Sequence, residues 1–279
     1  MESDWTVSSG GGRFQALWQP GCLFLRKLSL EGVPVLQGVY FALRDENWET
    51  ITPKVEDMTV EEGEDTLKIA TRVNWSTETI GLEGQLAIQS TGPGVVEWTF
   101  SGCATRTFRS NRIGFLVLHP PECAGQGIVT ESPEGVVTEG VFPEAISPHQ
   151  PFMNLRALRH FPAEGMTVET RMEGEIFEME DQRNWTDASF KTYSTPLAEP
   201  FPRLIEAGAR INQSVKVRVE TANGFVGRKH DETIRIKDMD SLSPQPLPSL
   251  GTEFHPEATR LLGGELNRLR AFGLSHLRF

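Results

Sequence analysis

One stretch decides the fold of this chain: Ile80-Gly81-Leu82-Glu83-Gly84-Gln85-Leu86-Ala87-Ile88-Gln89. Its large apolar residues fall on even positions, whereas Glu83, Gln85 and Gln89 fall on odd positions. A period of two is typical of a β-strand that has one face against a core and the other in water. The stretch therefore predicts a half-buried strand.

The same pattern recurs along the chain up to about residue 240. Alternating or apolar runs lie at 22–30, 33–43, 66–73, 94–100, 112–118, 152–160, 166–172, 175–181 and 215–219. Turn sequences separate them: Glu62-Gly63-Glu64-Asp65, Thr91-Gly92-Pro93-Gly94, Ser132-Pro133-Glu134-Gly135 and Ala222-Asn223-Gly224. Many short strands separated by turn sequences predict a mainly β protein, an antiparallel β-sandwich over residues 1–240.

The pattern changes after residue 240. Residues 241–255 have the proline-rich composition of an extended linker. A leucine stripe at helical spacing predicts a helix over 256–271, and 274–279 reads as a strand. We expect 256–279 to be a short α/β tail, the helix–strand start of a (β/α) barrel. Its apolar side chains predict an oligomer or a partner that covers them.

Composition excludes several classes of function. The 279 residues carry 27 basic and 38 acidic side chains, a net charge of −11, and no basic cluster for nucleic acid. No apolar stretch is long enough to span a membrane, and the N-terminus does not resemble a signal peptide, so we expect a cytoplasmic protein. Three cysteines without a CxxC pair, and histidines without metal-ligand spacing, predict neither a metal nor a cofactor.

The densest set of reactive side chains lies in residues 176–193. If 176–181 is a strand, Glu178 and Glu180 share one face, and Asp181 ends the core-facing row. The following loop offers the mixture that binds a polyhydroxylated ligand: Arg183, Asn184, Trp185, Asp187 and Lys191. We expect Asp181, Asn184, Trp185 and Lys191 to converge on one concave surface. The alternative is a polar connection whose side chains cap its own backbone.

A second group of residues ends the apolar run at 112–118. His119 follows it directly, and a neighbouring carboxylate would raise the pKa of this histidine into the range useful for proton transfer. The alternative is a structural histidine. Serine-hydrolase, dinucleotide and P-loop motifs do not occur in the sequence.

Two motifs together resemble the D-apionate lactonase (D-apionolactonase) family: Asn111-Arg112-Ile113-Gly114-Phe115 running to His119-Pro120, and Phe177 to Tyr193. The resemblance implies an N-terminal sandwich similar to sugar-mutarotase domains, ahead of a (β/α) barrel and a C-terminal β domain. It implies hydrolysis of D-apionolactone to D-apionate. Members of the family are about twice as long as this chain, which ends where the first barrel strand is expected.

We therefore expect a sugar-lactone hydrolase that acts without cofactor. Asp181 or Glu180 would be the base and Arg183 or Lys191 the electrophilic partner, with His119 as a further proton-transfer candidate. The substrate-binding candidates are Arg112, Arg183, Asn184, Trp185, Asp187 and Lys191. Two alternatives remain open. One is a non-catalytic carbohydrate-binding or scaffolding sandwich, and the other is a mutarotase-like epimerase that uses His119 with a carboxylate.

Overall fold

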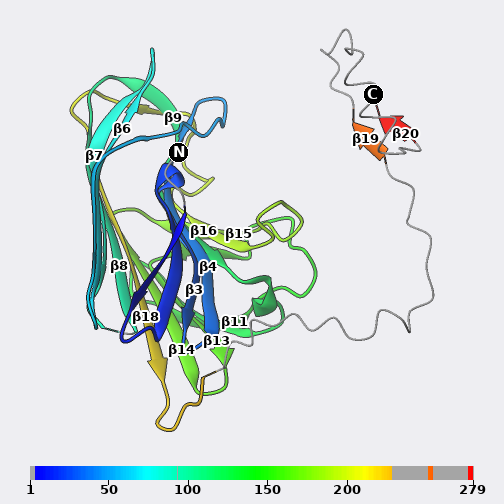
Figure 1. Cartoon of the computed structure of the whole chain (residues 1–279). Helices are drawn as coiled ribbons and strands as arrows, with labels where there is room; N and C mark the ends of the chain where they lie inside the picture. The colour runs from blue at the N-terminus through cyan, green and yellow to red at the C-terminus, as the bar shows by residue number, and fades with distance from the viewer. Residues whose placement is uncertain (1–3, 93, 228–250, 254–275, 279) are drawn as a thin grey trace. The chain divides into compact units, whose positions relative to one another are not determined.

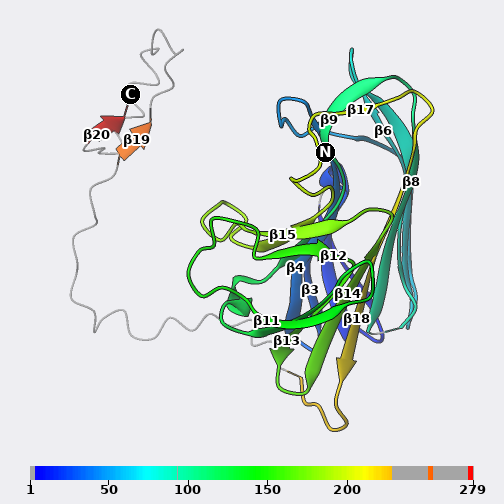
Figure 2. The same ribbon diagram turned by 180° about the vertical axis from the view of Figure 1, so that it is seen from behind.

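The computed structural model describes residues 4–92, 94–227, 251–253 and 276–278. Residues 1–230 form one compact unit and residues 231–279 a second. In the first unit two nine-stranded sheets pack face to face (Figure 1 and Figure 2). Every strand pair within these two sheets is antiparallel. The predicted mainly β sandwich is confirmed.

The first sheet, called sheet A, carries the candidate residues. Across it lie β1 (Trp5–Ser9), β2 (Phe14–Gln19), β3 (Phe24–Leu30), β4 (Val33–Asp45), β9 (Phe108–His119), β16 (Phe190–Tyr193), β15 (Phe177–Asp181) and β12 (Phe152–Leu155), with β17 (Arg203–Ile205) also paired to β9. Two single 3-10 turns, η1 (Pro20–Cys22) and η2 (Pro121–Cys123), follow β2 and β9. Because β4 and β16 flank β9, residues 65 or more positions apart in sequence become neighbours.

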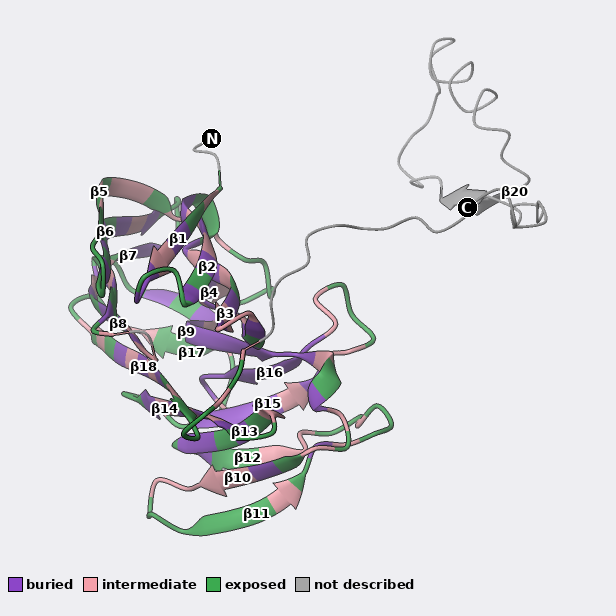
Figure 3. Cartoon of the chain, turned by 60° about the horizontal axis from the view of Figure 1, so that its bottom comes forward, coloured by how far each residue is buried: buried purple, intermediate pink, exposed green. Residues whose placement is uncertain are grey.

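The second sheet, called sheet B, covers one face of sheet A. Across it lie β11 (Val137–Val141), β10 (Gly127–Glu131), β13 (Ala157–Ala163), β14 (Met166–Glu173), β18 (Arg210–Thr221), β8 (Val95–Ala104), β7 (Gly81–Ser90), β6 (Leu67–Ser76) and β5 (Lys54–Glu62). Figure 3 shows that burial is concentrated where the two sheets meet, whereas the edge strand β11 is largely exposed.

The core between the sheets is aromatic at its centre. Phe41 from sheet A packs against Trp75 and Phe100 from sheet B, with its ring centroid 4.0 Å from that of Phe100, and against Phe115 of its own sheet. Gly84, in the stretch that predicted the fold, faces inward, and a Cβ there would lie 2.7 Å from the Phe100 ring. Glycine is required at that position because the Phe100 ring fills the space of its side chain.

The second unit contains one described strand pair. β19 (Gly251–Glu253) and β20 (His276–Arg278) are parallel. β19 lies in the segment predicted as linker, and β20 lies in the strand predicted over 274–279. The predicted helix over 256–271 lies outside the described residues, so the tail stays a prediction.

Two histidines lie in the core between the sheets and couple stability to pH. The side chain of His160 is fully buried and its Nε2 lies 3.0 Å from the carbonyl oxygen of Val35. Its ring centroid is 5.5 Å from that of His119. Burial lowers the pKa of His160 to about 4 from an ordinary 6.5. The folded state therefore binds a proton much more weakly than the unfolded state.

We expect stability to fall as the pH drops from 6.5 towards 4. Above this window both states hold a neutral His160, and within it only the unfolded state gains the proton, at a cost of about 3 kcal/mol. Urea midpoints across this window should depend less on pH in His160→Gln, which keeps a donor for Val35. The exposed His149→Gln is the control. An unchanged pH dependence in His160→Gln would contradict this expectation.

Candidate functional site on the outer face of sheet A

The site arises from the alternation of side chains along β15 and β16. Phe177, Met179 and Phe190 enter the core. The intervening residues therefore point to the face of sheet A that turns away from sheet B, called the outer face. The register pairs Glu178 with Tyr193 and Glu180 with Lys191 across the two strands. Four functional side chains consequently lie side by side.

Lys191 is the cation at the centre of this group. Its Nζ lies 3.7 Å from Glu180 Oε1 and 3.5 Å from Asp187 Oδ2, and it donates a hydrogen bond to Gln182. The Lys191 side chain is 7% exposed, whereas the two carboxylates are each 28% exposed. The ammonium group is thus fixed by its acceptors, while the carboxylates remain accessible to a small molecule.

Glu180 holds its proton more tightly than an ordinary glutamate. Burial raises the pKa of the Glu180 carboxyl above its usual 4.5, although Lys191, Arg112 and Arg44 act in the opposite direction. A carboxylate with a raised pKa is a better proton acceptor near neutral pH. Glu180 therefore combines access to solvent with the basicity that general-base catalysis requires.

Arg112 reaches the same face from β9. Its guanidinium carbon lies 4.0 Å from the ring centroid of Tyr193. The Tyr193 hydroxyl donates to Glu178, and burial raises the pKa of this tyrosine. The carboxylate of Glu178 also accepts the amide of Leu197 at 2.7 Å. Glu178 and Tyr193 thus fix the surface on which Arg112 rests.

Tyr40 and Arg44 complete the group from β4. Tyr40 packs against the small apolar cluster of Ala42, Leu116 and Tyr193 on the outer face. Burial raises the pKa of Tyr40 to about 12, and the charges of Arg44, Asp187 and Glu180 also act on it. Tyr40 is therefore a neutral hydrogen-bonding group beside the charged ones. We call Tyr40, Arg44, Arg112, Glu178, Glu180, Asp187, Lys191 and Tyr193 the outer-face cluster.

The structure brings together four of the predicted residues, Arg112, Glu180, Asp187 and Lys191. The predicted convergence of Asp181 with Lys191 is wrong, because they occupy opposite faces of sheet A. Successive strand residues alternate, so Asp181 points away from the face that Glu180 occupies.

Asp181 instead pairs with Arg183 beneath the loop. The Asp181 side chain is fully buried and accepts the Arg183 guanidinium at 2.8 Å and the Ser147 amide at 3.0 Å. Burial acts to raise the pKa of Asp181, but the bonds from Arg183 and Ser147 outweigh it and hold the pKa below its usual value. Arg183 also donates to the carbonyls of residues 143–145. This pair fastens the loop to residues 143–147, and a bond from the Arg183 amide to Asp181 at 3.3 Å is the capping within the connection that the alternative expected.

The remaining candidates are Asn184, Trp185 and His119, which are not among the residues of the outer-face cluster. Asn184 and Trp185 are exposed, and the Trp185 side chain is 68% accessible. His119 is fully buried, with Nε2 3.0 Å from Thr192 Oγ1. Burial and the neighbouring His160 lower the pKa of His119 well below 6.5, so the predicted rise is wrong. A histidine enclosed by the core cannot reach a substrate, which leaves the epimerase alternative without its proton-transfer residue.

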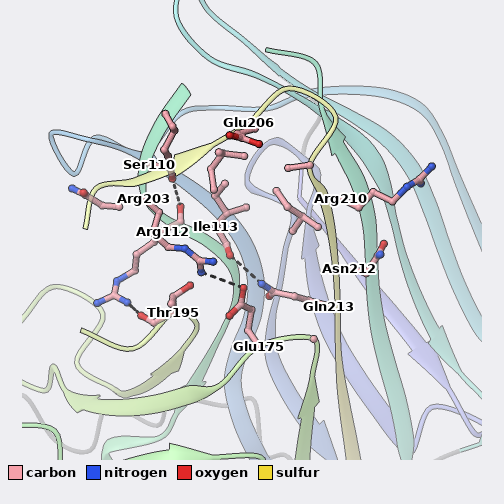
Figure 4. Close-up of a pocket in the computed structure, with 16 residues that line it drawn as sticks. Ser110, Arg112, Ile113, Glu175, Thr195, Arg203, Glu206, Arg210, Asn212 and Gln213 are labelled. Atoms are coloured by element: carbon pink, nitrogen blue, oxygen red, sulfur yellow. Dashed lines mark hydrogen bonds and ion pairs between the residues drawn. The ribbon is translucent and has the colours of Figure 1, made fainter. Parts of the chain in front are cut away.

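A polar cleft of about 540 Å³ borders the outer-face cluster (Figure 4). Gln213 lines the cleft. Its side chain donates a hydrogen bond to the Ile113 carbonyl and accepts one from the Phe115 amide, both at 3.0 Å. Arg203 pairs with Glu175 at 3.4 Å across it. In Figure 4 the side chain of Arg210 extends away from these groups. Side chains of both signs line the cleft, with Arg112, Arg203 and Arg210 against Glu175 and Glu206.

Among the described residues, no group of three or more His, Cys, Asp and Glu side chains could hold a metal ion. None of their helices has the length and apolar character needed to cross a membrane.

Comparison with known proteins gives one family. Residues 7–222 match the model of the D-apionate lactonase N-terminal domain. Over 197 residues the chain is 36% identical to a D-apionate lactonase from Brucella anthropi. The match covers 70% of this chain but 32% of that protein, so the chain spans about a third of the length of its curated relative.

Solved structures show the same fold at low sequence identity. A protein from Synechocystis sp. PCC 6803 has a TM-score of 0.53 at 10% identity, covering 80% of this chain and 97% of its own. A galactose 1-epimerase from Lactobacillus acidophilus NCFM has a TM-score of 0.51 at 4% identity, covering 75% and 92%. A candidate aldose 1-epimerase from Escherichia coli K12 has a TM-score of 0.50 at 13% identity, covering 79% and 99%. The sandwich is therefore of the mutarotase-like type.

Proposed function

The chain belongs to the D-apionate lactonase N-terminal domain family, and on this premise we propose that it is part of a sugar-lactone hydrolase whose substrate is D-apionolactone. The observation that carries the proposal is the placement of Glu180, Lys191 and Arg112 together on the outer face of sheet A. A base beside fixed cations is what hydrolysis of a lactone requires.

In the proposed reaction Glu180 removes a proton from a water molecule as the water oxygen attacks the lactone carbonyl carbon. The carbonyl oxygen becomes an oxyanion, which Lys191 and Arg112 stabilise by charge and hydrogen bonding. The tetrahedral intermediate then collapses, the bond to the ring oxygen breaks, and the Glu180 proton passes to that oxygen. The product is a hydroxy acid, which releases one proton to solvent at neutral pH.

Two measurements test this function in the full chain. A pH-stat should record proton release from D-apionolactone, with γ-butyrolactone, which lacks the hydroxyls, as the comparison. Because burial raises the pKa of Glu180, kcat/KM should increase with pH through a midpoint above 4.5. Absence of proton release above the rate in buffer would contradict the proposal.

A second function, sugar binding without catalysis, is favoured because the match covers only 32% of the relative. A sandwich that spans a third of a longer protein can hold the sugar while other residues perform the chemistry. This function gives D-apionolactone binding without proton release from this chain. A cytoplasmic location, and a partner that covers the apolar side chains of 256–279, remain predictions from the sequence.

A further inference from the structure

Two exposed aromatic side chains lie next to the outer-face cluster. Trp48, in the connection between β4 and β5, is 39% exposed, and Phe201, in the connection between β16 and β17, is 48% exposed. Their ring centroids are 5.4 Å apart and the rings cross at 68°. Trp48 and Phe201, 153 positions apart in sequence, meet here because β4 and β17 pair with opposite edges of β9. Two connections thus build one aromatic surface.

The backbone on either side of Trp48 is held in place by hydrogen bonds. Asp45 accepts the amides of Asn47 and Glu49, both at 2.8 Å, and Arg44 donates to the Trp48 carbonyl at 3.2 Å. Trp48 also has a φ of 70°, which is rare for a bulky residue. Such conformations persist where the surroundings impose them, often at ligand sites.

Arg112 joins this surface to the cluster. Its guanidinium carbon lies 5.2 Å from the Trp48 ring centroid and 4.0 Å from that of Tyr193. It also donates to the carbonyl of Thr195, as Figure 4 shows. Thr195 and Phe201 belong to the same connection, so this bond ties the guanidinium to the segment that carries the Phe201 ring.

We propose that Trp48 and Phe201 form a sugar-ring subsite that packs against the C–H face of the ligand, while Arg112 hydrogen-bonds its oxygens. A sugar ring has an apolar C–H face and a polar edge, and aromatic rings beside a fixed donor match both. The ligand class rests on the proposed function. The subsite itself rests on the exposure, contact and fixed backbone of these two side chains.

The test measures binding separately from turnover. Saturation-transfer NMR titrations of D-apionolactone use the full chain carrying Glu180→Gln, so that the lactone survives the experiment. In this background Trp48→Ala and Phe201→Ala should each weaken binding by about 2- to 10-fold, the range expected for loss of an aromatic contact. Phe161→Ala, at an exposed aromatic residue on β13 of sheet B, is the matched control and should bind like its parent. Both aromatic positions are exposed, so these variants should keep the fold.

The outcomes separate the two proposals. Equal binding by the Trp48, Phe201 and Phe161 variants overturns the subsite, even if Lys191→Met loses proton release as the hydrolase proposal expects. Weakened binding by the Trp48 and Phe201 variants supports the subsite, even if the unsubstituted chain releases no protons and the hydrolase proposal fails. Absence of any saturation transfer to the lactone in both Glu180→Gln and the unsubstituted chain overturns the subsite.

Discussion

Replacing Glu180 by Gln is expected to lower kcat/KM for D-apionolactone by about 10²- to 10⁴-fold, the usual contribution of a positioned general base. The amide keeps the size and much of the hydrogen bonding of the carboxylate, but it cannot accept the proton of water. Lys191→Met should lose about 10²- to 10³-fold, because it removes a charge beside the developing oxyanion. Initial rates of proton release measure both effects.

Matched controls distinguish chemistry from general damage. Glu173→Gln changes an exposed glutamate on sheet B, and Lys216→Met changes a half-buried lysine of the same sheet whose Nζ lies 3.6 Å from Glu97. Both should retain the parental rate. If Glu180→Gln hydrolyses the lactone as fast as Glu173→Gln does, the outer-face cluster is not the base-bearing site.

Replacing Asp181 by Ala is expected to destabilise the sandwich by about 3–5 kcal/mol, the typical cost of breaking a buried ion pair. The carboxylate is fully buried, and its removal leaves the Arg183 guanidinium, 11% exposed, without its anionic partner. The Ser147 amide also loses its acceptor. Equilibrium unfolding in urea measures the loss, provided that the unfolding transition stays two-state.

The control for Asp181 is an ion pair of equal length in a more exposed place. Arg159 and Glu169 approach to 2.7 Å with side chains 46% and 23% exposed, so Glu169→Ala should cost less than about 1 kcal/mol. If Asp181→Ala costs no more than Glu169→Ala, the buried pair does not fasten the loop. A catalytic role for Asp181 would then need to be reconsidered.

The sequence predicted most of the long alternating strands, overlooked β2 although its burial alternates, and missed short strands without a periodic pattern. Residues 81–90 and 210–221 place apolar side chains on one parity, and both form strands that pair with β8 at the centre of sheet B. β11 has almost no buried face, and β16 and β17 have four and three residues. Such strands form through backbone pairing with neighbours distant in sequence, which leaves no periodic signal.

The site was predicted only in part. It depends on the alternation along single strands, which the sequence shows, and on the pairing between strands, which the sequence does not show. The shared parity of Glu178 and Glu180 was readable along one strand, and the structure confirms it. Tyr40 and Arg44 could not be assigned, because only the pairing of β4 with β9 brings them to Arg112. His119 was misread because an apolar strand that ends in histidine does not reveal that sheet B covers it.

The most direct test of the central claim is a crystal structure of the Glu180→Gln chain with D-apionolactone bound. We predict the lactone on the outer face of sheet A, with its carbonyl oxygen within hydrogen-bond distance of Lys191 or Arg112 and its ring against Trp48 and Phe201. A lactone bound instead only in the cleft between Arg203 and Gln213, or only at the loop that carries Trp185, would contradict the account.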